Sequence, residues 1–194
     1  MSTWAVFLSK WNRKKTESEQ RSCLTDWQTA SIVVSKRVNY TGWKRMNRKV
    51  AREIALKLIY ELEFHSEAED EALEWRVSRE AFSLISDEDD AFESYPNDIQ
   101  LDYILRVVRG VRSHLTELDG HIDRYLISWK RERVSCIAVS VLRLCVFELI
   151  YLRDEIPPGS SINEAVELTK KYDSDETASF VNGVLGAFFR AEEI

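Results

Sequence analysis

Apolar residues recur every three or four positions along most of the chain after Met46, which is the spacing of an amphipathic helix. The pattern is clearest in residues 46–64, with apolar side chains four apart at Val50, Ile54, Leu58 and Leu62. This stripe predicts a helix of about five turns with one apolar face. Similar stripes predict further helical structure in 65–98, 99–129, 161–172 and 180–188, with Gly110 as a candidate break.

The most apolar run is VSCIAVSVLRLCVFELIYL, residues 134–152, and it contains Arg143 and Glu148. Two ionisable side chains in so short a span would be costly in lipid, so we interpret the run as a central helix buried in protein. The two charges lie about 140° apart around a helix and cannot pair with each other. Because an unpaired buried charge is costly, we expect each to have a partner on a neighbouring helix.

Three short motifs mark where helices begin. Residues 96–98, Pro-Asn-Asp, form a stop followed by an N-cap. Residues 161–164, Ser-Ile-Asn-Glu, have the hydroxyl and carboxylate of a capping box and predict a helix start at Ser161. Residues 173–176, DSDE, form a turn rich in N-cap residues. With only six Gly and three Pro, the chain is predicted to have an all-α fold of about seven helices and no strand.

The first 45 residues show no sustained period, although they hold four of the six Trp. Residues 1–50 carry a net charge of +8 and residues 51–194 a net charge of −14, so a basic arm precedes an acidic body. This asymmetry favours contact with a polyanion, and a solvated tail is the alternative. The composition of the arm also leaves a transit peptide open. We therefore divide the chain into a basic N-terminal extension, 1–45, and a helical domain, 46–194.

The sequence offers little support for catalysis or metal binding. It lacks a G-x-G-x-x-G motif, a Walker A motif and a G-x-S-x-G nucleophile motif. The three Cys have no metal-ligand spacing, and we expect Cys136 and Cys145 to be small buried residues of the apolar run. His114 and His121 stand seven apart with no matching carboxylate or thiol evident, which favours surface or capping roles. We predict a cytoplasmic protein that is not an enzyme and needs no cofactor or metal.

Nucleic-acid binding has more support. Five cations lie within residues 44–52, and four of them follow the i, i+3, i+4, i+7 spacing of one helix face: Arg45, Arg48, Lys49 and Arg52. Such a stripe can follow a phosphate backbone. Tyr60, two turns beyond Arg52, could supply a stacking platform for an unpaired base. The alternative is a stripe that only aids solubility and a Tyr60 that belongs to the core.

Two segments carry a more specific pattern. RKVAREIALKLIYELEF (48–64) is an arginine-rich opening helix. VLRLCVFELIYLRDEIPPGSSINEAVELTKKYDSDETASFVNGVLGAF (141–188) contains LR-x4-EL, then IP, then INEA-x-EL, then FVNGVL. In order and spacing these blocks resemble the NusB family of bacterial transcription antitermination factors. The resemblance spans roughly residues 46–190, weakens over 65–98 and leaves 1–45 uncovered.

The resemblance implies an all-helical fold of two small packed bundles. It also implies binding to the single-stranded boxA element of leader and ribosomal RNA transcripts. The expected protein partner is NusE, a ribosomal small-subunit protein, and the pair would join an RNA polymerase antitermination complex. No catalysis is expected. Because some members of the family self-associate, a homodimer is an open alternative.

The resemblance also implies RNA contacts at positions that match the family's motifs. Three are cations at the start of the first helix: Arg48, Lys49 and Arg52. Val50 stands where an Arg can occur, so the patch is thinner here. The aromatic residue of the same helix is Tyr60, the implied stacking platform. Two further aromatics that match positions near the family's RNA surface are Tyr125 and Phe180.

Other matching positions imply partner contacts or structure. The acidic turn Asp175–Glu176 corresponds to a stretch that influences antitermination and partner contact in the family. Glu164 is expected to cap and brace a helix together with its neighbour Asn163. At Asn182 and Gly183 we expect a tight contact between helices, since glycine spacing in a helix is typical of close packing.

Two other functions remain open. A NusB-like domain could serve as a protein-interaction adaptor with little RNA affinity, which the thinner arginine motif and acidic body allow. NusB-like domains also occur in RNA cytosine methyltransferases, but these need a long C-terminal catalytic domain that we do not expect beyond Ile194. Because chains of the family usually begin just before the arginine-rich motif, we expect residues 1–45 to be an upstream extension from a misassigned start codon or a lineage-specific arm.

Overall fold

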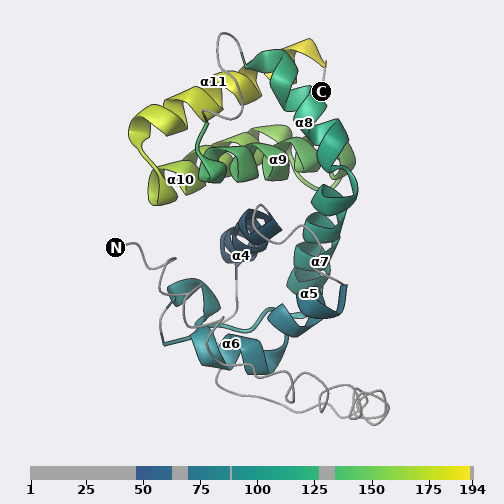
Figure 1. Cartoon of the computed structure of the whole chain (residues 1–194), viewed down its shortest axis with the longest axis vertical. Coiled ribbons are helices and arrows are strands. Elements are labelled where there is room, and N and C mark those ends of the chain that lie inside the picture. Colours follow the sequence, from purple (N-terminus) through teal and green to yellow (C-terminus); the bar gives the residue numbers. More distant parts are fainter. Residues whose placement is uncertain (1–46, 63–69, 88, 127–133, 193–194) are drawn as a thin grey trace. The chain divides into compact units, whose positions relative to one another are not determined.

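In the computed structural model of the chain, the described residues are 47–62, 70–87, 89–126 and 134–192. All of them lie in one compact unit, Lys44–Ile194. They form eight α-helices and one short 3-10 helix, and no strand occurs among them, so the all-α class is confirmed (Figure 1). The predictions made for the N-terminal extension, 1–45, lie outside the described residues.

The elements follow one another along the chain as α4 (Arg48–Leu62), α5 (Asp70–Arg76), α6 (Arg79–Ile85), η1 (Asp90–Phe92), α7 (Asp98–Ser113), α8 (Leu115–Tyr125), α9 (Cys136–Tyr151), α10 (Pro158–Tyr172) and α11 (Asp175–Ala191).

Helix α9 is the centre of this unit. Every residue from Ala138 to Leu149 is buried, as expected for a helix that is apolar on all sides. α4 and α7 pack against α9 and against each other. α8, α10 and α11 also pack against α9 and form the second group of helices (Figure 1). The two helical groups therefore share α9, and the prediction of a buried central helix is confirmed.

The two charges inside α9 both have partners on other helices, as predicted. Arg143 donates from Nε and Nη2 to the carboxylate of Asp119 on α8, at 2.7 and 2.9 Å. Glu148 accepts hydrogen bonds from Arg52 on α4 and Tyr103 on α7. Among the described helices, none is long and apolar enough to cross a bilayer.

Side-chain caps fix several helix starts. Asn97 and Gln100 form a reciprocal capping box at the start of α7, with distances of 3.0 and 3.1 Å. Ser174 accepts from the backbone N–H of Thr177 at 3.1 Å and caps α11. The predicted caps at 96–98 and 173–176 are therefore confirmed. α4 has a cap of the same kind, since Asn47 accepts from the backbone N–H of Val50.

The capping box predicted at Ser161 is wrong. α10 begins one turn earlier, at Pro158, and proline is favoured at the first helical position because its fixed φ suits a helix and its missing N–H costs nothing there. Ser161 is consequently an interior residue of α10, 1% exposed, and its hydroxyl has no hydrogen-bond partner. The sequence motif was present, but a stronger start signal preceded it.

Three smaller predictions are also wrong. α7 runs through Gly110 without a break, and the ring of Phe147 occupies the space beside that glycine. Cys145 is buried as predicted, but Cys136 is exposed because it is the first residue of α9. Asn182 and Gly183 lie on the exposed face of α11, and an added Cβ at Gly183 would meet nothing within 4 Å. They make no tight interhelical contact there.

Candidate nucleic-acid interface

The first turn of α4 places two cations at the surface. Arg48 and Lys49 are both exposed, and the side chain of Lys49 is 69% exposed. The first turn contains no acidic residue, so these cations stand at the positive end of the helix macrodipole. This arrangement costs a few tenths of a kcal/mol for each charge and favours the approach of an anion.

Arg48 is held against α7. Its guanidinium carbon lies 5.7 Å from the ring centroid of Tyr103, a cation–π distance. Arg106 on α7 donates two hydrogen bonds of 2.6 Å to Glu155, in the turn after α9. The Arg106 bonds hold the pKa of Glu155 below its usual value, and the charge of Arg48 contributes to that shift.

Lys49 is paired with α10. Its Nζ lies 2.8 Å from Oε1 of Glu164, whose side chain is only 14% exposed. The predicted bracing role of Glu164 is therefore an ion pair between helices, and its capping role is wrong because the helix starts earlier. No sequence pattern indicated this pairing, because Lys49 and Glu164 are far apart in the chain.

Arg52 lies inside the protein. It is 2% exposed, and its Nε donates to Oε1 of Glu148 at 2.9 Å. The hydroxyl of Tyr103 donates to the same oxygen at 2.5 Å. Burial, followed by the adjacent Glu148 carboxylate, raises the pKa of Tyr103 well above its usual value. Of the three cations predicted as RNA contacts, Arg48 and Lys49 are therefore exposed, whereas Arg52 is buried.

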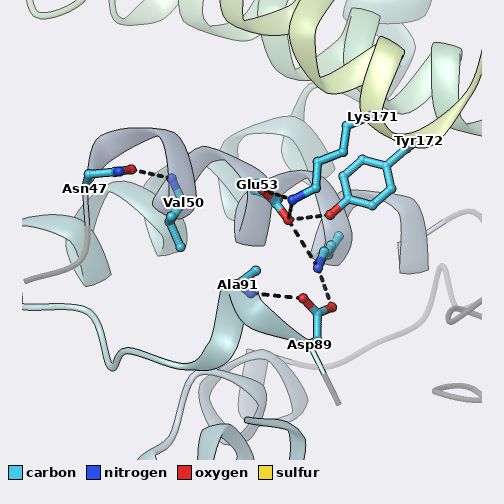
Figure 2. Close-up of polar contacts among 8 residues, drawn as sticks. Asn47, Val50, Glu53, Asp89, Ala91, Lys171 and Tyr172 are labelled. Atoms are coloured by element: carbon cyan, nitrogen blue, oxygen red, sulfur yellow. Dashed lines mark hydrogen bonds and ion pairs between the residues drawn. The ribbon is translucent and has the colours of Figure 1, made fainter. Parts of the chain in front are cut away.

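A polar network ties the middle of α4 to neighbouring elements (Figure 2). Glu53 accepts hydrogen bonds from Lys171 at 2.8 and 2.9 Å and from the hydroxyl of Tyr172, both near the end of α10. Lys57 pairs with Asp89, the residue that caps η1, and lies 3.4 Å from Glu53. Two ion pairs therefore bridge α4 and α10. In Lys49–Glu164 the cation belongs to α4, and in Glu53–Lys171 it belongs to α10.

Tyr60 lies near the other end of α4 and is half-buried. Burial raises the pKa of its phenol, and the nearby Cys136 at the start of α9 adds to the rise. Tyr60 follows Lys49 by eleven residues, or three turns, which puts the two about 20° apart around the helix axis and ~16 Å apart along it. The structure thus places Lys49 and Tyr60 on the same side of α4.

The other predicted residues lie on the second group of helices. Tyr125, at the end of α8, donates to Glu192 at 3.0 Å and packs edge-on against Phe188. Phe180 on α11 is half-buried against the core. Asp175 and Glu176 are exposed in the first turn of α11, where acidic side chains favour the helix dipole.

The arrangement offers groups that can bind an anion and stack a base. Arg48 and Lys49 offer donors for phosphate, and Tyr60 offers a partly exposed ring. Within the described residues, no group of three or more His, Cys, Asp or Glu could hold a metal ion. Sequence reasoning missed Arg106, a further cation that acts on Glu155 together with Arg48. Its place in the stripe of α7 carried no signal that distinguished it from other exposed cations.

Comparisons with known proteins find one family over most of the helical unit. The sequence profile of the NusB family matches residues 49–190. A Clostridium botulinum protein (strain Loch Maree / Type A3) named transcription antitermination protein NusB is 40% identical over 143 residues, which cover 73% of this chain and 98% of the relative. The protein of that name from Acetivibrio thermocellus is 39% identical over 142 residues, covering 73% of this chain and 87% of the relative.

Solved structures agree. T. maritima NusB is similar with a TM-score of 0.59 and 25% identity, covering 76% of this chain and 93% of that one. A structure described as antitermination factors NusB and NusE in complex with dsRNA has a TM-score of 0.55 and 28% identity, covering 74% of this chain and 96% of that one. With its profile, its sequence relatives and its helical arrangement in agreement, this chain belongs to the NusB family.

Proposed function

We propose that this protein is a transcription antitermination factor that binds boxA RNA together with a NusE-type ribosomal protein and supports processive transcription of ribosomal RNA operons. The observation that carries the proposal is the similarity over 98% of the length of a relative named transcription antitermination protein NusB. A solved relative in complex with NusE and RNA supports both the ligand and the partner. The proposed role requires binding and assembly, not catalysis.

The proposed RNA contacts divide into phosphate and base contacts. Arg48 and Lys49 bind phosphates, because they are exposed cations at a helix N-terminus. Tyr60 stacks a base three turns away on the same side of α4. Arg52 is a positioning residue in this proposal, since its hydrogen bond to Glu148 anchors the first turns of α4 against α9.

The residues of the second helical group have subsidiary roles in the proposal. Tyr125 and Phe180 extend the RNA surface through the exposed parts of their rings. Asp175 and Glu176 contact a protein partner or limit RNA affinity, because exposed carboxylates repel phosphate. A homodimer that covers part of the RNA surface remains a proposal that the oligomeric state in solution would test.

RNA binding by the full chain tests the proposal, with and without NusE, on single-stranded boxA RNA, a scrambled strand and a double-stranded RNA of the same length. The double-stranded probe is included because the solved relative contains dsRNA. We expect a preference for boxA that NusE increases. Phosphate contacts through Arg48 and Lys49 contribute about −0.7 each to the slope of log affinity against log salt.

Variants identify the surface. Tyr60→Ala removes a stacking ring and should weaken boxA binding about 5- to 150-fold, since stacking on an aromatic contributes ~1–3 kcal/mol per base. The matched control is Tyr151→Ala, which removes a 40%-exposed tyrosine from α9. Arg48→Ala should flatten the salt dependence, with Arg109→Ala on α7 as its control.

The adaptor function is the second candidate, and one observation favours it. The exposed cations of α4 stand beside carboxylates of the same chain, so the surface is less basic than its sequence indicates. If the protein binds NusE while boxA and scrambled RNA bind equally weakly, the adaptor function is correct and the antitermination proposal fails.

A further inference from the structure

The cations that the RNA-binding proposal uses are already opposed by carboxylates. Lys49 lies 2.8 Å from Glu164, and its charge also lowers the pKa of Glu167, one turn further along α10, where the hydrogen bond from Lys170 is the largest cause. Arg48 acts on Glu155, which Arg106 holds by two hydrogen bonds. The cations of the first turn of α4 therefore interact with carboxylates on α10 and in the turn after α9.

Among these pairs, Lys49–Glu164 has an unequal exposure. The side chain of Lys49 is 69% exposed, and that of Glu164 is 14% exposed. Glu164 belongs to α10, a helix packed on both α9 and α11, and its carboxylate is largely shielded from solvent. Lys49 has a flexible stem in the exposed first turn of α4. A phosphate that reaches the ammonium of Lys49 must therefore approach the carboxylate of Glu164, which lies 2.8 Å from it.

We propose that Glu164 competes with RNA phosphate for Lys49 and thereby sets the RNA affinity of this surface. The inference rests on the proposed RNA-binding function. The paired ammonium must exchange a carboxylate for a phosphate, so part of the favourable contact with RNA offsets the loss of the ion pair. The carboxylate that is left behind also repels the bound phosphate. Glu164 is thus an affinity-determining residue that need not touch RNA itself.

A positioning role for Glu164 would have the reverse effect on RNA binding. If the carboxylate positioned Lys49 for phosphate, its removal would weaken RNA binding. An ion pair whose cation is exposed to water orders the lysine side chain only weakly, because its net stabilisation is small. The large exposure of Lys49 therefore favours competition over positioning.

The test is RNA binding by Glu164→Gln in the full chain, with boxA RNA as the probe. We expect about two- to fivefold tighter binding, the size of a small ion-pair contribution. Two variants make the same charge change elsewhere. Glu167→Gln lies one turn away on the same helix, and Glu74→Gln removes a carboxylate paired with Arg109 at 2.9 Å on α5 and α7. Both should tighten binding less than Glu164→Gln.

A second background separates competition from general repulsion. In Lys49→Gln, the effect of Glu164→Gln should shrink to that of Glu167→Gln, because there is no ammonium left to release. An equal gain in both backgrounds would overturn the inference, and so would weaker RNA binding by a Glu164→Gln protein that retains its helical circular dichroism.

The failure of the proposed function is a different result. If neither the wild-type chain nor Glu164→Gln distinguishes boxA from scrambled RNA, both the function and the inference fail. If the wild-type chain prefers boxA but Glu164→Gln does not bind more tightly, only the inference fails. A gain of boxA preference in Glu164→Gln alone supports the inference.

Discussion

Two ion pairs connect the first turns of α4 to different helices, and they differ in how far they are buried. Arg52 and Glu148 form the inner pair, with side chains 3% and 0% exposed and with Tyr103 donating to the same carboxylate oxygen. Lys49 and Glu164 form the outer pair, where the cation is 69% exposed. The two cations stand three positions apart on one helix. Their sequence spacing suggests one shared function, but their surroundings separate them.

The difference shows that the neighbouring helices decide what a cation does. The inner pair joins α4 to α7 and α9 and is shielded from water, so breaking it exposes an uncompensated charge to the interior. The outer pair has an exposed cation, so under the proposed function it can exchange its carboxylate for a phosphate. The inner pair therefore supports the fold, and the outer pair leaves its cation open to solvent.

The largest predicted effect comes from breaking the inner pair. Arg52→Ala leaves Glu148 buried without its ion partner, and we expect it to lower the free energy of unfolding by about 3–5 kcal/mol. Lys49→Ala is the matched change in the outer pair and should cost less than about 1 kcal/mol. Urea denaturation followed by circular dichroism measures both. Equal small losses would mean that the two pairs do not differ as their burial indicates.

A third pair, at the far end of α4, extends the comparison to pH. Glu61 is buried beside Arg76, whose Nε lies 2.8 Å from Oε2, yet that oxygen accepts no hydrogen bond. Burial raises the pKa of Glu61 to about 7, although Arg76 acts to lower it. The folded protein then holds a proton that the unfolded chain releases near its ordinary value. Stability from this group is full below that value and is lost as the pH rises through about 7.

We therefore expect the stability of the wild-type chain to fall between pH 5 and pH 8 by about 2–3 kcal/mol through Glu61. Glu61→Gln cannot titrate and should lack this component. Urea denaturation at the two pH values gives the difference, with the exposed carboxylate variant Glu74→Gln as the control. The same pH dependence in wild type and Glu61→Gln would show that the ion pair keeps Glu61 charged in the folded state.

Two glycine substitutions compare a tightly packed position with an open one and change no charge. A Cβ at Gly110 on α7 would lie 2.1 Å from the ring of Phe147, whereas one at Gly120 on α8 would meet nothing within 4 Å. Gly110→Ala should destabilise the protein by about 1–3 kcal/mol, because the ring must move. Gly120→Ala should stabilise it by about 0.5–1 kcal/mol through helix propensity. Thermal unfolding of the pair checks the signs, and a stabilised Gly110→Ala would contradict the packing.

The sequence was sufficient for features that depend on neighbouring residues. The four-residue spacing at Val50 and Ile54 predicted α4, and the caps at Asn97 and Ser174 follow from side-chain chemistry within one turn. The need for partners at Arg143 and Glu148 also followed, because it is an energetic requirement of any buried charge. The resemblance to NusB added the arrangement of helices that no periodicity could supply.

Contacts between distant segments were beyond the sequence. Arg52 meets Glu148 across 96 positions of the chain, so nothing near Arg52 distinguished it from the exposed Lys49. The position of Tyr60 beside Cys136 depends in the same way on how α4 meets α9. The sequence thus supplied candidate residues for the proposed RNA surface, while the assignment of each to the surface or the interior required the packed helices.

The smallest predicted effect on stability comes from two serines in N-cap motifs. Ser174 stands three positions before Thr177, and Ser161 stands three positions before Glu164, so both serines have the spacing of an N-cap motif. Only Ser174 caps a helix. Ser174→Ala should cost about 1 kcal/mol, the usual loss of an N-cap. Ser161→Ala should cost nothing or stabilise slightly, since it removes a buried hydroxyl without a partner from a helix interior. A loss of about 1 kcal/mol in Ser161→Ala would restore the capping box that the sequence suggested, so the two variants measured together decide whether Pro158 or Ser161 starts α10 in solution.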